Sequence, residues 1–368
     1  AIESIDRIKD KDFKMKNAYQ IMAYNYGVEL FQNGENDQSI DNFKLVKRYP
    51  IDPKLNALSY YWIAEAYFKM TAYEDAITWY KSFIAEPGSY GLNQHNDAYY
   101  NIAYCYFKQG KYDLAIQSFR TFTQDTKEVH KEKITDAYLR IGDAYFVKPK
   151  VDGNNDDDNA ILYYNKAIET GGGQLDYAKY QVGLTYGFKG NYVAKAKSML
   201  DIVNNYNKST FAIPALFEAG ESYRLMNNSD DADHYAKAKK YYNQLIKDHP
   251  NHAKVVDAIF QIGMLSFISK DYAAAEAQFL KIINEYDNKE KEKEALSRLE
   301  DIYTATNKPQ KYLDLLDKIG VVYNKSYEDS ITYESAYRSY EDSLFSDAAA
   351  SFKVYLKNFS PPQNELNA

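Results

Sequence analysis

Two stretches of the sequence align with each other without a gap. Residues 57–84 read ALSYYWIAEAYFKMTAYEDAITWYKSFI, and residues 96–123 read NDAYYNIAYCYFKQGKYDLAIQSFRTFT. Self-similarity at a fixed period is typical of repeat proteins, in which each unit buries its apolar face against its neighbours. This repeat limits the possible folds more strongly than any other feature of the chain. The matched pairs include Tyr60 with Tyr99, Ile63 with Ile102, Ala64 with Ala103, Tyr67 with Tyr106, Ala76 with Ala115 and Tyr80 with Phe119.

Each copy has the pattern of two amphipathic helices joined by a short turn. Apolar or small residues recur at i, i+3, i+4 and i+7 in both halves, as in a helix that is buried on one side. The break between the halves falls at residues 70–72 in one copy and 109–111 in the other, where Gly110 can adopt the positive φ that ends a helix. We therefore expect each copy to be a helical hairpin, with small residues such as Ala64 and Ala76 allowing close approach of its helices.

This spacing resembles the tetratricopeptide repeat, and residues 98–116, AYYNIAYCYFKQGKYDLAI, follow that family's consensus closely. The resemblance extends along the chain and implies an all-α fold: a right-handed superhelical solenoid of about nine helix-turn-helix repeats, forming one domain over residues 1–368. Units here recur every 36 to 43 residues, against about 34 in the family, so we expect the excess in loops. The predicted repeats are residues 20–53, 57–90, 96–130, 135–172, 176–209, 213–252, 256–288, 293–322 and 329–362.

Both ends of the chain look cut. Residues 1–8 resemble the end of a second helix whose first helix is missing, and residues 364–368 resemble the start of another first helix. We expect the chain to be a fragment of a longer array.

Composition and charge exclude several classes of function. With a formal net charge of −7, the chain lacks the excess of Lys and Arg expected of a nucleic-acid-binding surface. No apolar run approaches the roughly 18 to 20 residues that span a bilayer, although a lipid anchor outside these residues is compatible with the chain. The single cysteine, Cys105, lies among residues of a buried type, so we expect an inert thiol.

The family resemblance also implies where a partner would bind. Stacked repeats leave an extended concave groove, lined mainly by the first helix of each unit. Rings occupy many of the positions that face this groove in the family, and such rings suit a peptide or a partner helix. The same positions also favour rings for packing between helices, so both roles stay open. The candidate groove residues are Tyr24, Phe31, Tyr61, Glu65, Phe68, Tyr100, Tyr104, Phe107, Phe146, Tyr180, Phe217, Glu221, Phe260, Phe267 and Tyr333, with Tyr340 at one further equivalent position.

One mode of recognition known in the family is not expected here. Members that hold the acidic C-terminal tails of heat-shock chaperones use Lys and Asn to clamp two carboxylates. Where that Asn would stand, this chain has Val28, Glu65, Tyr104, Asp143, Leu184 and Glu221.

No pattern in the sequence predicts a catalytic, metal or cofactor site. The loop at residues 151–159, VDGNNDDDN, carries four Asp but lacks the spacing of an EF-hand, so we interpret residues 152–158 as a solvated insertion, with cation binding left open. A similar insertion at residues 227–234 lies at the same place in its hairpin.

The remaining polar features have plain structural interpretations. His249 and His252 flank Pro250 in a predicted solvated turn, and residues 171–173 form a glycine connector. The charged run KEKEKE at residues 289–294 is interpreted as the solvated start of a helix.

We therefore predict a non-catalytic scaffold that binds a peptide or protein partner in its groove. The sequence is rich in Tyr, Asn and Lys and contains segments such as YLKNF at residues 355–359. In this composition it is similar to Bacteroidetes-type envelope proteins that serve outer-membrane assembly, secretion or gliding. This similarity implies a periplasmic, outer-membrane-associated protein, with a cytoplasmic adaptor as the alternative. A regulatory or targeting region of a multidomain enzyme is a second alternative, and the oligomeric state stays open.

Overall fold

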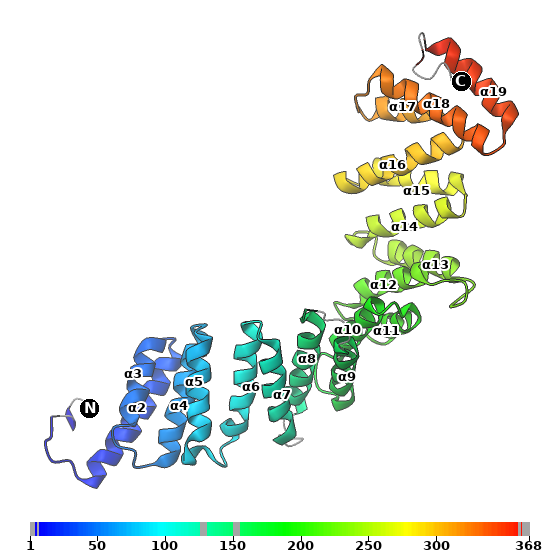
Figure 1. Ribbon diagram of the computed structural model, residues 1–368. Coiled ribbons are helices and arrows are strands. Elements are labelled where there is room, and N and C mark those ends of the chain that lie inside the picture. Colours follow the sequence, from blue (N-terminus) through cyan, green and yellow to red (C-terminus); the bar gives the residue numbers. More distant parts are fainter. Residues whose placement is uncertain (1–3, 6, 126–130, 150–154, 360–361, 363–368) are drawn as a thin grey trace. The chain divides into compact units, whose positions relative to one another are not determined.

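The computed structural model describes residues 4–5, 7–125, 131–149, 155–359 and 362. These residues form eighteen α-helices, one short 3₁₀-helix and no strand, so the prediction of an all-α fold is confirmed (Figure 1). The helices are α2 (Phe13–Gln32), α3 (Asn36–Val46), α4 (Pro53–Lys69), α5 (Tyr73–Ala85), α6 (Asn93–Lys108), α7 (Tyr112–Asp125), α8 (Lys131–Val147), α9 (Asp156–Thr170), α10 (Leu175–Phe188), α11 (Tyr192–Asn205), α12 (Ala212–Leu225), α13 (His234–Asp248), α14 (Lys254–Ile268), α15 (Tyr272–Glu285), α16 (Lys289–Ala305), α17 (Pro309–Lys318), α18 (Lys325–Glu341) and α19 (Phe345–Asn358), with η1 at Pro87–Ser89.

The chain divides into two compact units, and each is described by itself. Unit 1 is Ala1–Gly190 and unit 2 is Asn191–Ala368. The helices of unit 1 pack in the pairs α2/α3, α4/α5, α6/α7 and α8/α9, and those of unit 2 in the pairs α12/α13, α14/α15, α16/α17 and α18/α19. The predicted helix-turn-helix pattern is therefore confirmed, and the bounds of the nine repeats stay predictions. The predicted fifth repeat, residues 176–209, supplies α10 to one unit and α11 to the other, and a single solenoid over residues 1–368 stays a prediction.

A ring of the second helix packs onto the small residue predicted in the first helix. A Cβ atom added at Gly142 would lie 2.6 Å from the ring of Tyr164, and one added at Gly263 would lie 2.7 Å from the ring of Phe279. Because Cβ atoms do not approach other atoms so closely, glycine sets the distance between the two helices at these positions. The same arrangement joins Gly27 to Phe43 and Gly220 to Tyr242.

The tight turn inside a hairpin carries one residue in the left-handed conformation. Gly110 has a φ of 71° there, which confirms the role predicted for it. Other hairpins place a residue with a Cβ atom in the same conformation, which costs roughly 1–2 kcal/mol. These residues are Thr71, Lys270, Asn307 and Ser343, with φ between 54° and 65°.

Longer connections replace the tight turn in α8/α9 and α12/α13. The insertion predicted at residues 227–234 lies between the end of α12 and the start of α13 at His234, so only its last residue is helical. Residues 150–154 of the aspartate-rich segment lie outside the described residues. The loop interpretation is wrong for the rest of that segment, because Asp156, Asp157 and Asp158 form the first turn of α9, where the helix dipole favours carboxylates.

Apolar side chains form the core between successive hairpins of each unit. Cys105 belongs to the core cluster of α4, α5 and α6 and is fully buried. Burial raises the pKa of its thiol to about 12, in line with the expected inert thiol. None of the helices in the described ranges is long and apolar enough to cross a membrane.

Candidate partner-binding surface

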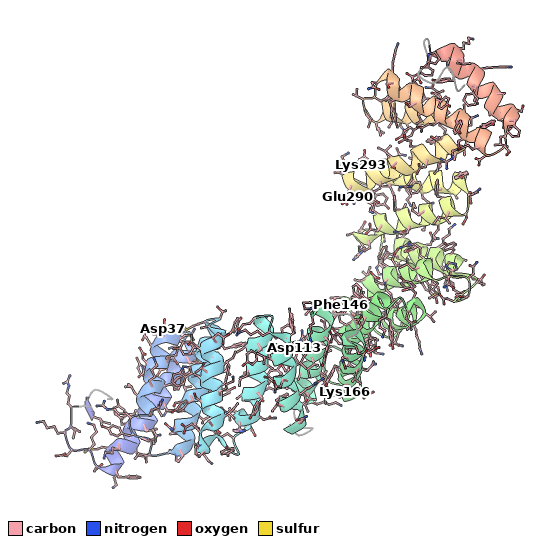
Figure 2. The ribbon with its side chains drawn as sticks, in the orientation of Figure 1. Asp37, Asp113, Phe146, Lys166, Glu290 and Lys293 are labelled. Carbon is pink, nitrogen blue, oxygen red and sulfur yellow. The ribbon has the colours of Figure 1, made fainter. Side chains whose placement is uncertain are left out.

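The first helices of successive hairpins lie next to one another within each unit. α2 contacts α4 and α4 contacts α6 in unit 1, and α12 contacts α14 and α14 contacts α16 in unit 2. We call the surface formed by α2, α4, α6, α8 and α10, or by α12, α14, α16 and α18, the first-helix face of its unit. All fifteen candidate groove residues belong to these helices. Phe146 of α8 is one of them (Figure 2). Phe31, Phe217 and Phe260 are buried, and the other twelve are half-buried.

One set of candidate rings packs onto the second helix of its own hairpin. The Tyr61 ring contacts the rings of Tyr80 and Phe83 at centroid distances of 5.7 and 5.3 Å. Such edge-on pairs add about 0.5–1.5 kcal/mol beyond the area they bury. These rings therefore stabilise the hairpin, and only part of each ring is left to contact a partner. The equivalent pairs are Tyr100–Phe119, Phe217–Tyr242, Phe260–Phe279 and Tyr333–Tyr355.

A second set of rings closes the turn end of the hairpin. Phe68 packs edge-on against Tyr73, the first residue of α5, at 5.7 Å. Tyr340 makes the same contact with Phe345, yet 53% of its surface is exposed. The part that all these rings play in partner binding stays a prediction. The other contacts of this kind are Phe107–Tyr112 and Phe267–Tyr272.

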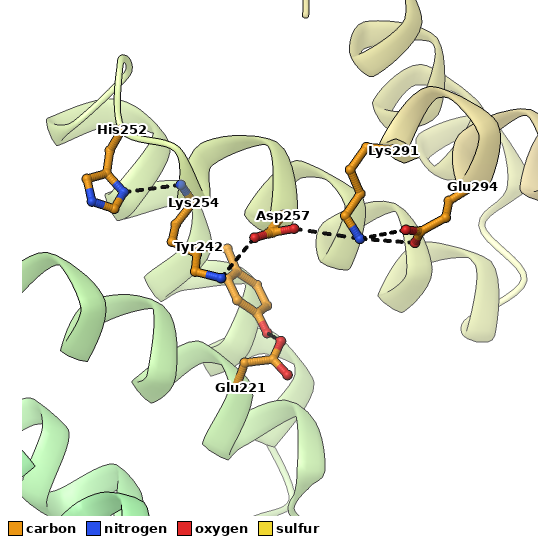
Figure 3. Close-up of polar contacts among 7 residues, drawn as sticks. All are labelled: Glu221, Tyr242, His252, Lys254, Asp257, Lys291 and Glu294. Atoms are coloured by element: carbon orange, nitrogen blue, oxygen red, sulfur yellow. Dashed lines mark hydrogen bonds and ion pairs between the residues drawn. The ribbon is translucent and has the colours of Figure 1, made fainter. Parts of the chain in front are cut away.

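Lysines from the next first helix cover four of the candidate rings, and the first of them, Lys69, places its Nζ atom 3.7 Å from the centre of the Phe31 ring. The Nζ atom of Lys254 lies 5.0 Å from the centre of the Phe217 ring, and that of Lys291 lies 4.8 Å from the centre of the Phe260 ring. Both lysines form ion pairs with Asp257: the Nζ atoms of Lys254 and Lys291 lie 3.1 and 3.6 Å from its carboxylate oxygens (Figure 3). An ammonium placed between a ring and a carboxylate gains from both contacts. The first-helix face of unit 2 therefore presents charged groups above its rings.

Unit 1 contains the same arrangement on α6 and α8. The Nζ atom of Lys133 lies 5.8 Å from the centre of the Tyr100 ring and 2.8 Å from a carboxylate oxygen of Asp97. The sequence prediction missed these lysines. Lys133, Lys254 and Lys291 share one signal, because each lies among the first three residues of a first helix.

The charged run at residues 289–294 is only partly a solvated helix start. α16 begins at Lys289, and Glu290 and Lys293 are exposed (Figure 2). Lys291, by contrast, has 21% of its side chain exposed and contacts both Asp257 and Glu294. One residue of the run therefore belongs to the first-helix face, because Lys291 contacts Asp257 and Phe260 of the preceding first helix, α14.

Four hairpins join their helices through a buried tyrosine and a carboxylate. In α18/α19 the Tyr355 hydroxyl donates to Asp329 over 2.7 Å, and the other three use the position of the first helix that Glu65 occupies. The Tyr80 hydroxyl donates to Glu65 over 2.6 Å, and the Tyr164 hydroxyl donates to Asp143 over 2.9 Å. Tyr242 donates to Glu221 in the same way. Burial raises the pKa of the Glu65 carboxyl, and hydrogen bonds from Tyr80 and Tyr61 oppose that rise.

The partners of these carboxylates differ between hairpins. Arg140 forms an ion pair with Asp143, and the Arg224 guanidinium contacts Glu221 at 2.7 Å. Glu65 instead accepts a second hydrogen bond from the Asn101 amide, over 2.6 Å. Hairpins whose second helix carries a phenylalanine have no carboxylate at this place: Val28 stands with Phe43, Tyr104 with Phe119 and Met264 with Phe279.

Asp136 joins neighbouring hairpins on the first-helix face of unit 1. Its carboxylate accepts hydrogen bonds from the hydroxyls of Tyr100, over 2.7 Å, and of Tyr104. The Arg140 guanidinium lies 3.4 Å from its other oxygen. The two candidate tyrosines therefore have a structural partner on the next helix.

The described ranges offer no group of three or more His, Cys, Asp or Glu side chains that could hold a metal ion. His252 lies in the predicted turn, where its Nδ1 accepts a hydrogen bond from the Lys254 amide over 3.1 Å. His234, which the sequence did not single out, is buried at the start of α13, with Nδ1 2.9 Å from the Tyr223 carbonyl oxygen. It fastens the insertion before α13 to the end of α12.

Comparisons with known proteins agree with this architecture. Sequence profiles of the tetratricopeptide repeat match residues 24–91, 97–121 and 214–252. The solved C-terminal part of a tetratricopeptide repeat-containing protein from Cytophaga hutchinsonii is similar, with a TM-score of 0.54 at 21% identity, over 73% of this chain and 97% of that chain. The apo form of RapI has a TM-score of 0.50 at 10% identity, over 92% and 91% of the two chains. At such identities the likeness concerns the fold alone, and no curated protein matches the chain.

Proposed function

This chain is a tetratricopeptide repeat protein, and from that premise we propose that it is a non-catalytic scaffold that binds a peptide or protein partner on its first-helix faces. Tetratricopeptide repeats generally mediate protein–protein interaction. The observation that carries the proposal is the layer of lysine–aspartate pairs above the rings. Such a layer combines apolar area with charges of both signs, and this combination gives an interface both affinity and choice of partner.

We further propose a periplasmic, outer-membrane-associated role in envelope assembly, secretion or motility. The Tyr-, Asn- and Lys-rich composition supports this part of the proposal. Cell fractionation of the producing organism tests it: the protein should be found with the outer membrane, and recovery from the cytoplasm would contradict the location.

Partner capture with charge-reversed variants tests the binding proposal. Lys133→Glu and Lys254→Glu together reverse two charges of the first-helix faces while leaving every ring in place. Lys197→Glu and Lys240→Glu, exposed on second-helix positions, make the same change of net charge elsewhere. We expect the first pair to lose partners captured by the unaltered chain and the control pair to keep them. Equal capture by both pairs would contradict binding on the first-helix faces.

A further inference from the structure

Tyr61 and Glu65 lie one turn apart on α4, on the first-helix face of unit 1. The Glu65 carboxylate accepts hydrogen bonds from the Tyr80 hydroxyl and the Asn101 amide, each over 2.6 Å. The same Asn101 amide also lies 3.3 Å from the Tyr61 hydroxyl oxygen. A ring and a carboxylate are thus fixed side by side by groups that carry no charge.

The equivalent ring in three other first helices is covered by a lysine of the next first helix. Lys133 covers Tyr100, Lys254 covers Phe217 and Lys291 covers Phe260. Gln94 follows Tyr61 by 33 residues, the same separation as between Tyr100 and Lys133. At the place that corresponds to Lys133, then, the chain carries the neutral amide of Gln94, where these three hairpins carry an ammonium.

A second and independent comparison shows that Glu65 also lacks a basic residue that equivalent carboxylates have. At the position equivalent to Glu65, two other carboxylates accept from a buried tyrosine, and each has its own arginine: Arg140 for Asp143 and Arg224 for Glu221. These arginines lie three residues before and three residues after the acid, and Trp62 and Phe68 hold those two places around Glu65.

Basic residues near Glu65 are engaged elsewhere. Lys133 and Lys69 act on its carboxyl through space. Lys133, however, is paired with Asp97 at 2.8 Å, and the Nζ atom of Lys69 lies 3.7 Å from the centre of the Phe31 ring. Within the described part of the chain, Glu65 has hydrogen bonds to neutral groups and forms no ion pair.

We propose that Tyr61 and Glu65 form a binding site for a basic side chain, a lysine above all, carried by the polypeptide partner. The proposal rests on the proposed function, because it names the chemistry that the partner must bring to the first-helix face. The partner's ammonium would take the place that Lys133 takes above Tyr100. It would lie against the Tyr61 ring and form an ion pair with Glu65, the combination that this chain already builds with its own lysines.

Selection from random dodecapeptides displayed on phage, with the full chain as bait, provides the probe. Peptides selected by the unaltered chain should share a lysine or arginine. A synthetic peptide from this set should bind at least about tenfold more weakly to Glu65→Gln, as expected for loss of a charge-assisted contact. Replacing the shared basic residue of the peptide by glutamine should weaken binding by a similar factor.

The variant Gln94→Lys tests the site without removing any of its side chains. The introduced lysine should cover Tyr61 as Lys133 covers Tyr100, and should weaken peptide binding at least about tenfold by occupying the site. Gln117→Lys adds the same charge at an exposed position of the second helix α7 and should leave binding within about twofold.

The outcomes separate this proposal from the proposed function. Peptides that bind without a shared basic residue, or that bind Gln94→Lys as well as the unaltered chain, would overturn the basic-side-chain site and leave the scaffold function standing. A selection that yields no binding peptide would count against the peptide-binding function itself, and the site would fall with it.

Discussion

The hairpins α4/α5 and α6/α7 align without a gap, yet they use their tyrosine hydroxyls differently. In α4/α5 the Tyr80 hydroxyl is satisfied inside the hairpin by Glu65. In α6/α7 the central ring is Phe119, and the hydroxyls of Tyr100 and Tyr104 bond to Asp136 of the next hairpin. The same backbone thus supports one hairpin whose two helices share a buried hydrogen bond and one whose central ring has no hydroxyl to make that bond.

This difference shows that the choice of residue in the second helix depends on the first helix. A buried hydroxyl without a partner costs about 1–3 kcal/mol, so tyrosine is favourable only where the first helix offers an acceptor. Four predictions follow the comparison from the largest expected effect to the smallest.

Phe119→Tyr should destabilise unit 1 most, by about 3 kcal/mol, because the fully buried ring gains both volume and a hydroxyl without a carboxylate to accept from it. The free energy of unfolding in urea measures the effect. Adding Tyr104→Glu recreates the α4/α5 pair and should restore part of the loss; no restoration would show that volume alone decides this site.

Glu65→Met should cost about 2 kcal/mol, because the Tyr80 hydroxyl is left buried without its acceptor. Tyr80→Phe added to Glu65→Met turns α4/α5 into the apolar type and should recover at least about 1 kcal/mol. A double-mutant cycle by urea unfolding gives the coupling energy directly, and a coupling near zero would mean that the two residues act independently.

The turns of the two hairpins offer a smaller contrast. Gly110→Ala should destabilise by about 1 kcal/mol, because alanine is strained at a φ of 71°. Thr71→Gly should instead stabilise by about 0.5 kcal/mol, since relief of strain at a φ of 60° exceeds the entropy that glycine adds to the unfolded chain. Thermal unfolding would show the two shifts in opposite directions, and equal signs would contradict the role given to the turn.

The smallest expected effect is a dependence of the stability on pH that comes from Glu65 of α4/α5. Burial raises the pKa of the Glu65 carboxyl above its usual 4.5. Protonation of this carboxyl therefore stabilises the folded state below pH 4.5, and this stabilisation is lost as the pH rises through the raised pKa. Between pH 4.5 and 7.5 the unaltered chain should lose more stability than Glu65→Gln. An identical pH dependence of urea unfolding in both proteins would show that the carboxyl is not perturbed.

The hairpins could be predicted from the sequence because their signals are local. Ala64 and Ala103 mark the close approach of two helices, and Gly110 marks the turn, all within one repeat. The sequence could not show whether Tyr61 and Tyr100 pack against the second helix or contact a partner, since tyrosine serves both purposes.

Contacts between repeats escaped prediction for a physical reason. Whether Lys291 covers Phe260 depends on the length of the connection between α15 and α16 and on where α16 begins. Because these connections vary in length, the sequence alone does not show which residue of one repeat lies above a ring of the preceding repeat. The burial of His234 likewise depends on the insertion before α13. Only the comparison of several hairpins in one structure reveals that Gln94 stands where a lysine is found elsewhere.

Photo-cross-linking in the producing cells tests most directly whether a partner binds the first-helix face. The cross-linking residue p-benzoylphenylalanine is placed at Lys69 or Lys108, exposed at the ends of α4 and α6, and in separate variants at Thr78 or Gln117, exposed on the second helices α5 and α7. We predict that positions 69 and 108 cross-link to a common protein and that positions 78 and 117 do not. Cross-links to that protein from the second helices alone would contradict a partner on the first-helix face.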